Sequence, residues 1–159
     1  MEPSLLQDGN PQMATAPRTI YLVKMLDVAI RAGLEQRLQE FQLTGAQYTV
    51  LSLLSTRDNL SSADLSRRFL VTPQSMNEMI MALERKELVS RQEDEDNRRI
   101  LRVKLTPHGQ AVLKRCDRQV DGLEAELFGA LDPSELARLR ETLNAVVASH
   151  RSATAPTKS

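Results

Sequence analysis

A short polar segment near the middle of the chain concentrates side chains that form directional hydrogen bonds. Its candidate residues are Thr72, Gln74, Ser75, Asn77 and Glu78. A glutamine or asparagine amide can bind adenine through two hydrogen bonds, and a hydroxyl group can bind a base or a phosphate. The same residue types also suit an ordinary solvated helix face, so both interpretations stay open on these residues alone.

A second candidate site is a pair of adjacent arginines, Arg98 and Arg99, at the end of the charged segment EDEDNRR (residues 93–99). A guanidinium group fits the narrow minor groove of DNA, where the negative potential is enhanced. The four acidic residues of this segment would repel phosphate if they faced a duplex, so they need another role. Asp96 could orient an arginine through a salt bridge. The alternative is a flexible turn whose charges neutralise one another.

The overall charge gives no global attraction to nucleic acid. The chain has 21 basic and 21 acidic residues, so its formal net charge is zero. Any DNA binding must therefore rest on local patches of charge. Arg67 and Arg68 are candidate phosphate clamps in such a patch, and simple solvation of an exposed helix explains them equally well.

Apolar spacing predicts the elements that position these side chains. Steps of three and four residues between apolar positions predict four consecutive helices, and two further helices follow a segment with strand-like alternation. The expected helices begin near Pro17, Thr44, Ser61, Thr72, Thr106 and Asp132, and the first runs to Phe41. The polar segment 72–78 thus opens the fourth helix. Residues 88–92 and 101–105 pair as a β-hairpin with residues 93–99 at its tip.

Several of the expected helix starts are marked by capping residues. In a capping box, the residue before the helix and the residue three positions later form two reciprocal hydrogen bonds. The side chain of each residue accepts from the backbone N–H group of the other. That spacing occurs in Thr44 with Gln47, in a looser form in Ser61 with Asp64, and in Asp132 with Glu135.

The resulting order α-α-α-α-β-β-α-α is mainly helical with a small β-hairpin. Two short helices joined by a tight turn and followed by a hairpin define a winged helix-turn-helix. The long first, fifth and sixth helices carry more apolar surface than one small lobe can cover, and a symmetric partner would bury the surplus. We therefore expect a DNA-binding lobe over residues 43–105, a helical dimerisation region over 17–42 and 106–150, and disordered tails over 1–16 and 151–159.

Three segments resemble the MarR family of bacterial transcription regulators. LTGAQYTVLSLL (residues 43–54) is similar to that family's second helix. LSSADLSRRFLVTPQSMNEMIMALERKELVSR (residues 60–91) is similar to its helix-turn-helix and first wing strand. DNRRILRVKLTPHG (residues 96–109) is similar to its wing signature. The three segments follow in order at the right separations, and with the flanking helices the resemblance covers residues 17–150.

Three residues depart from the family pattern. Leu70 lies in the tight turn where many members have glycine, which predicts a different backbone geometry there. Glu87 stands where glycine often ends the recognition helix, and a left-handed conformation at that site would cost glutamate about 1 kcal/mol relative to glycine. Glu78 lies on the recognition helix where a basic or neutral residue is commoner, so base preference cannot be taken from relatives.

The resemblance implies a ligand-responsive repressor that binds double-stranded DNA. As a homodimer it would place two recognition helices about one helical turn apart on a pseudo-palindromic operator. The resemblance also implies a small-molecule effector bound between the dimerisation helices and the DNA lobes, with identity and binding residues that the sequence leaves unknown. The alternative is a helical dimer that uses its winged-helix shape to bind another protein, which Glu78 and the acidic hairpin tip favour.

Other classes of function find no support in the sequence. There is no catalytic motif, so we expect neither an enzyme nor a cofactor, and the two histidines lack the neighbours that a metal site requires. Without a secretory signal or a membrane span, we expect a cytoplasmic protein. Cys116 has no partner for a disulfide and falls on an apolar stripe, which favours a buried residue over a redox sensor.

Overall fold

The structure is a computed structural model that describes residues 16–154. Its elements are α1 (Thr19–Leu38), the 3-10 turn η1 (Gln39–Phe41), α2 (Gly45–Thr56), α3 (Ser62–Phe69), α4 (Pro73–Arg85), β1 (Val89–Glu93), β2 (Leu101–Leu105), α5 (Pro107–Phe128) and α6 (Pro133–Thr154). This sequence of elements confirms the predicted order of four helices, a hairpin and two helices.

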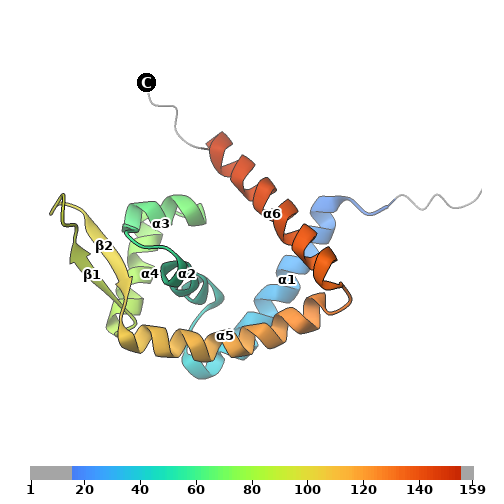
Figure 1. Ribbon diagram of the computed structural model, residues 1–159, viewed down its shortest axis with the longest axis horizontal. Coiled ribbons are helices and arrows are strands. Elements are labelled where there is room, and N and C mark those ends of the chain that lie inside the picture. Colours follow the sequence, from blue (N-terminus) through green and yellow to red (C-terminus); the bar gives the residue numbers. More distant parts are fainter. Residues whose placement is uncertain (1–15, 155–159) are drawn as a thin grey trace, which may run out of the picture.

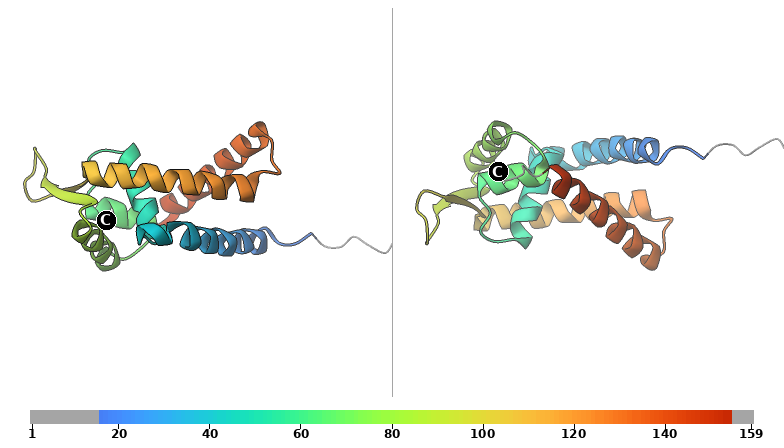
Figure 2. Two further views of the ribbon diagram at one scale, coloured as in Figure 1. Left: turned by 90° about the horizontal axis from the view of Figure 1, so that it is seen from below. Right: turned by 90° about the horizontal axis from the view of Figure 1, so that it is seen from above.

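The short helices and the hairpin gather at one end of the molecule (Figure 1). Helices α1 and α5 lie side by side and lead away from this lobe, as both views of Figure 2 show. Helix α6 begins at the far end of α5 and turns back, and the side chains of residues 140–153 are all exposed. Two long helices thus carry a small lobe, and a third long helix lies largely open to solvent.

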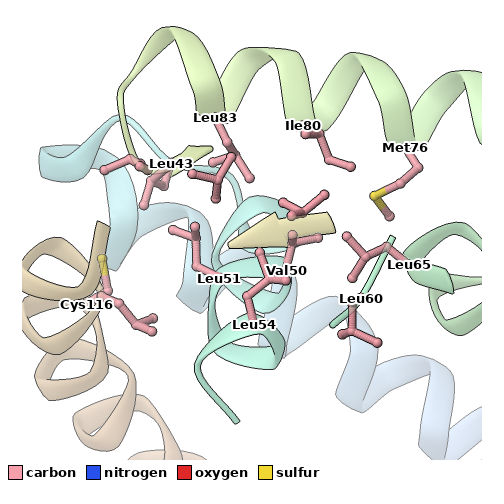
Figure 3. Packing of buried hydrophobic residues seen from close by; sticks show 14 of the residues in the cluster. Leu43, Val50, Leu51, Leu54, Leu60, Leu65, Met76, Ile80, Leu83 and Cys116 are labelled. Atoms are coloured by element: carbon pink, nitrogen blue, oxygen red, sulfur yellow. The ribbon is translucent and has the colours of Figure 1, made fainter. Parts of the chain in front are cut away.

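The hydrophobic core of the lobe lies between α2, α3, α4 and the hairpin. In Figure 3 the apolar side chains of α4 project from one side of the helix toward those of α2. The fully buried members from these two helices are Met76, Ile80, Leu83, Val50 and Leu51. Leu65 of α3 and Val103 of β2 extend the same cluster. This packing fixes the rotation of α4, because only one face of a helix can bury its apolar stripe.

The predicted capping boxes form as expected. The Thr44 hydroxyl accepts a hydrogen bond from the Gln47 backbone N–H, and the Thr44 N–H donates to the Gln47 side chain, both at 3.1 Å. Ser61 and Asp64 make the same reciprocal pair at the start of α3. At the start of α6, the Asp132 N–H donates to Glu135 at 2.9 Å. Each box satisfies backbone donors that a helix start leaves free.

The β1–β2 hairpin, called the wing below, is antiparallel with Val89 opposite Leu105 and Glu93 opposite Leu101. The predicted first strand began at residue 88, one residue too early. Leu88 instead completes the end of α4, because its N–H donates to the Leu83 carbonyl at 3.0 Å. The other edge of β2 is also covered, since the Val103 N–H donates to the Leu60 carbonyl at 2.8 Å.

Two further boundaries differ from the sequence-based expectations. The first helix was predicted to run to Phe41, but α1 ends at Leu38 and a 3-10 turn follows before Gln42 turns left-handed, with φ 53°. The tail predicted from residue 151 is wrong over residues 151–154, which continue α6. Of the two predicted tails, residues 1–15 and 155–159 lie outside the described residues.

Leu70 and Glu87 both adopt the left-handed conformation that glycine favours. Leu70 ends α3 with φ 54°, so the expectation of a different turn geometry at this site is wrong. Glu87 follows α4 with φ 57°, and its carbonyl accepts from the Thr106 hydroxyl at 2.6 Å. A Cβ atom in this region clashes with the backbone, so both residues carry local strain.

Replacing Glu87 with glycine should therefore stabilise the protein. We expect Glu87→Gly to raise the free energy of unfolding by about 0.5–1 kcal/mol, because glycine adopts φ 57° without a Cβ clash. Urea denaturation followed by circular dichroism measures this change. Glu87→Ala is the matched control, since it removes the carboxylate but keeps the Cβ atom and should give no such gain. Equal stabilisation by both variants would assign the effect to charge rather than to backbone strain.

Candidate nucleic-acid interface

All five predicted residues of the polar segment lie on one exposed surface. Thr72 precedes α4, and Gln74, Ser75, Asn77 and Glu78 occupy its first two turns; all five are exposed. An α-helix turns by about 100° per residue, so two residues four positions apart lie nearly on one line along its axis. Gln74 and Glu78 therefore stand on the side of α4 opposite its buried stripe. The surface available to a ligand is the polar half of the helix.

Hydrogen bonds order part of this surface. The Thr72 hydroxyl accepts from the Ser75 N–H at 3.1 Å and donates to the Ser75 hydroxyl at 2.9 Å. Thr72 is thus both the cap of α4 and a partner of Ser75. One turn along, the Gln74 side-chain amide donates to the Glu78 carboxylate at 3.2 Å. The side chains at the start of α4 are consequently held in pairs rather than left to move singly.

Arg98 and Arg99 lie at the exposed tip of the wing. Among the described residues, the acidic partner of Arg98 is Glu93, at 4.0 Å, and the Arg98 side chain remains 88% exposed. The Arg99 N–H donates to the Asn97 side chain at 3.1 Å, which shapes the turn without occupying the guanidinium group. Within residues 16–154, no side chain neutralises Arg99 through an ion pair. The tip therefore presents two available cations.

The acidic residue that orients an arginine is Asp94, rather than the predicted Asp96. The Asp94 carboxylate accepts from the backbone N–H groups of Asp96 and Asn97, both at 3.0 Å, and so closes the turn. Its second oxygen accepts from Arg102 Nε at 2.6 Å. Hydrogen bonds from Arg102 and then from Asn97 hold the pKa of Asp94 below its usual value of 3.8.

Arg102 connects the wing to the start of α3. One of its guanidinium nitrogens donates to the Asn59 carbonyl at 2.7 Å and lies 3.5 Å from the Asp64 carboxylate. Burial alone would raise the pKa of Asp64, but hydrogen bonds from Ser61 hold it below 3.8. Sequence reasoning missed Arg102, since alternation along β2 assigned it to the solvated face. Its partners come from two distant segments that only the tertiary fold brings together.

A second arginine connects the wing to α4. Arg91 Nε lies 3.2 Å from the Glu84 carboxylate, and both side chains are mostly buried. Sequence reasoning also missed this pair. Together with the Arg102 contacts, it anchors each wing strand to a different helix of the lobe. The wing is therefore held at a defined position beside the exposed face of α4.

The two predicted phosphate clamps differ in availability. Arg67 donates to Asp64 at 2.5 Å, so its charge is partly compensated although its side chain is 65% exposed. Arg68 is half-buried at the end of α3. Both residues lie in the last turn of that helix, where a basic side chain also interacts favourably with the helix dipole. Interactions within the protein therefore already compensate part of the positive charge of Arg67 and Arg68.

A cavity of about 530 Å³ lies where α2 and β2 meet α5. Buried apolar side chains form its floor, and three cations lie along its walls. These residues are Leu54, Val103 and Leu113, and Arg57, Lys104 and Lys114. Two acidic residues, Asp58 and Asp117, also line the cavity, and the Asp117 carboxylate accepts from the Tyr48 hydroxyl at 2.9 Å. The lining thus has one more basic than acidic residue, which suits a small molecule with an apolar body and a single negative charge.

Two further candidates for a site are the cysteine and the potential metal-binding side chains. Cys116 is fully buried in the core, and burial raises the pKa of its thiol to about 11, which leaves little reactive thiolate at neutral pH. Among the described residues, no group of three or more histidine, cysteine or acidic side chains is arranged to hold a metal ion. None of the helices in residues 16–154 is long and apolar enough to cross a membrane.

The Arg102 contacts predict how the wing responds to acid. Because the pKa values of Asp94 and Asp64 are both lowered, their stabilising contribution is complete above about pH 5 and is lost as the pH falls through the lowered values. In Arg102→Gln the Asp94 carboxylate should titrate at a higher pH, closer to 3.8. NMR titration of the aspartate carboxyl carbons measures this shift. Arg118→Gln, at an exposed site on α5, is the control, and an unchanged Asp94 titration in Arg102→Gln would contradict the assignment.

Comparison with known proteins agrees with this geometry. A model of the MarR family matches residues 43–101. The chain is 31% identical over 123 residues to the HTH-type transcriptional repressor Rv2887 of Mycobacterium tuberculosis, covering 77% of this chain and 88% of that protein. A MarR mutant from E. coli, solved in complex with operator DNA, superposes with a TM-score of 0.69 and 27% identity over 79% of this chain and 91% of that chain. The Rv2887 structure with salicylic acid gives a TM-score of 0.66 and 28% identity, covering 84% of this chain and 99% of that chain. The chain therefore belongs to the MarR family of transcription regulators.

Proposed function

We propose that this protein is a repressor that binds a pseudo-palindromic DNA operator as a homodimer and responds to a small anionic effector. The observation that carries the proposal is the exposed polar face of α4 beside an anchored wing with two available arginines. An α-helix fits the major groove of B-DNA, and arginines fit the adjacent minor groove. The operator complex of the E. coli MarR mutant supports this use of the fold.

In this proposal each part of the lobe has its own role. Thr72, Gln74, Ser75 and Asn77 read base edges or bind phosphate in the major groove. Glu78 reads base edges there, and Arg98 and Arg99 enter the minor groove. Arg67 and Arg68 bind phosphate as secondary contacts. Residues 43–105 form the DNA-binding lobe. The near-neutral charge of the chain favours base-specific binding over tight non-specific association.

Exposed apolar surface on the long helices supports a homodimer. The first half of α1 exposes Ile20, Tyr21, Leu22, Val23, Met25 and Val28, and α6 exposes Leu143, Val146 and Val147. A folded monomer rarely leaves so much apolar surface in water, and a two-fold partner would cover it with the same surface of a second copy. We therefore assign residues 17–42 and 106–150 to dimerisation.

The cavity between α2, β2 and α5 is the proposed effector site. It joins the DNA-binding lobe to a dimerisation helix, so a bound molecule would alter how the lobes are held relative to each other. A ligand releases DNA only if it binds better to a dimer whose α4 helices are wrongly spaced for the operator. The three cations at its walls suit a carboxylate, and the Rv2887 complex with salicylic acid supports an aromatic acid of this kind.

Selection of duplexes from a random library tests the DNA-binding proposal. We expect a pseudo-palindrome whose affinity falls steeply as salt rises, because binding releases counterions from phosphate. Changing both Arg98 and Arg99 to alanine should weaken binding to that duplex by about 10-fold or more and reduce its salt dependence. Fluorescence anisotropy across a salt series measures both effects.

The control for this pair is Arg118→Ala with Arg138→Ala, which removes the same charge from α5 and α6. It should leave DNA affinity within about 2-fold of the parent, provided that the protein remains dimeric. If no duplex is enriched by folded, dimeric protein, or if the wing variant binds as well as the parent, DNA binding through this surface is refuted. The protein-interaction alternative would then be preferred.

The effector proposal predicts a charge requirement at Lys104. We expect salicylate to weaken operator binding by the parent protein, and Lys104→Gln to require a several-fold higher concentration for the same effect. Lys104→Arg keeps the positive charge and should respond nearly as the parent does. Competition in the same anisotropy assay measures the response. Equal sensitivity of the parent and Lys104→Gln would exclude Lys104 from the effector site.

A further inference from the structure

We propose that Glu78 is a specificity-determining residue that selects cytosine in each operator half-site. This inference rests on the proposed DNA-binding function and adds a base identity to it. Glu78 is exposed on the second turn of α4, on the side opposite the buried Met76 and Ile80. A helix that enters the major groove by its exposed face brings this carboxylate against base edges.

The Gln74–Glu78 hydrogen bond fixes which groups face the bases. An ionised carboxylate only accepts hydrogen bonds, so the nitrogen of the Gln74 amide must face Glu78, and it does so at 3.2 Å. This contact points the Gln74 amide along the helix and leaves its carbonyl oxygen free to accept. The second oxygen of Glu78 is also free to accept. The outermost line of α4 therefore presents acceptors held in a defined orientation.

The charge of Glu78 restricts which base can lie opposite it. Among residues 16–154 the Glu78 carboxylate forms no ion pair. The salt bridges of the wing and of α4 engage Glu84, Glu93 and Asp94. An uncompensated carboxylate is repelled by phosphate and by the acceptor atoms of bases. Its presence on the groove-facing side is favourable only where a base donates a hydrogen bond to it.

Cytosine is the base that meets this condition with the fewest acceptors around its donor. In the major groove, guanine presents the acceptors N7 and O6, and thymine presents the acceptor O4. The N6 donor of adenine lies between two acceptors, its own N7 and O4 of the paired thymine, whereas the N4 donor of cytosine has an acceptor on one side only, O6 of the paired guanine. Glu78 accordingly favours cytosine through one hydrogen bond and disfavours guanine and thymine through repulsion.

The test uses the duplex that the full-length protein selects, with each base pair of one half-site replaced in turn. We expect one position where cytosine is preferred over thymine by about 10-fold in the parent protein. Glu78→Gln keeps the size and helix propensity of the side chain, so the protein should fold as the parent does. It should reduce that preference to about 2-fold and leave the preferences at the other positions unchanged.

Glu95→Gln, which removes a carboxylate from the tip of the wing, is the matched control and should leave all base preferences unchanged. A selected operator without a Glu78-dependent cytosine position overturns this inference but leaves the proposed function intact. Loss of cytosine preference in Glu95→Gln as well would assign the effect to general charge and also overturn it. Failure to select any duplex refutes the proposed function itself, and the inference falls with it.

Discussion

The burial of one stripe of α4 in the core that it shares with α2, α3 and the hairpin is the constraint on which the rest of the site depends. Met76 and Ile80 are completely excluded from solvent, and their packing leaves α4 a single rotational setting. That setting turns Gln74 and Glu78 outward, so the polar face is exposed as a consequence of the core rather than by any contact of its own. Losing a buried methionine or isoleucine side chain costs about 2–5 kcal/mol, far more than any hydrogen bond on the exposed face contributes. The orientation of the proposed DNA-reading surface is therefore set by apolar packing.

The position of the wing depends on charge rather than on apolar burial. A two-stranded hairpin is only marginally stable alone, and the exposed tip of this one buries little apolar surface. Arg102 and Arg91 compensate by connecting the two strands to the start of α3 and to the end of α4. These ion pairs are mostly shielded from solvent, so they are screened by salt less than surface pairs are. The strands of the wing are thus held by ion pairs that salt weakens less than it weakens contacts with phosphate.

Local signals predicted much of the fold, whereas contacts between distant segments were not predictable. Capping at Thr44 and Ser61 depends on residues three positions apart, so the sequence was sufficient to locate those helix starts. Arg102 binds partners as far as 43 positions away, and no spacing rule connects them. The exposure of the five α4 residues and of the wing arginines agrees with the predicted site, since helix and strand periodicity specify which face is polar. Their contacts with DNA remain a prediction, because side-chain exposure does not identify a ligand.

The placement of the cavity connects the two halves of the molecule. Leu113 and Lys114 line it from α5, the helix that also packs along α1 far from the lobe, while Val103 and Lys104 line it from β2. Strand β2 in turn carries Arg102, which anchors the wing. A molecule bound in the cavity would therefore contact the base of the wing and a long helix at once. Since a packed core shifts between discrete arrangements rather than deforming gradually, even a small displacement at this junction would be carried to the wing tip and along α5 together. In the proposed homodimer, that coupling would give a small ligand a physical route to change the spacing of the two proposed DNA-reading surfaces.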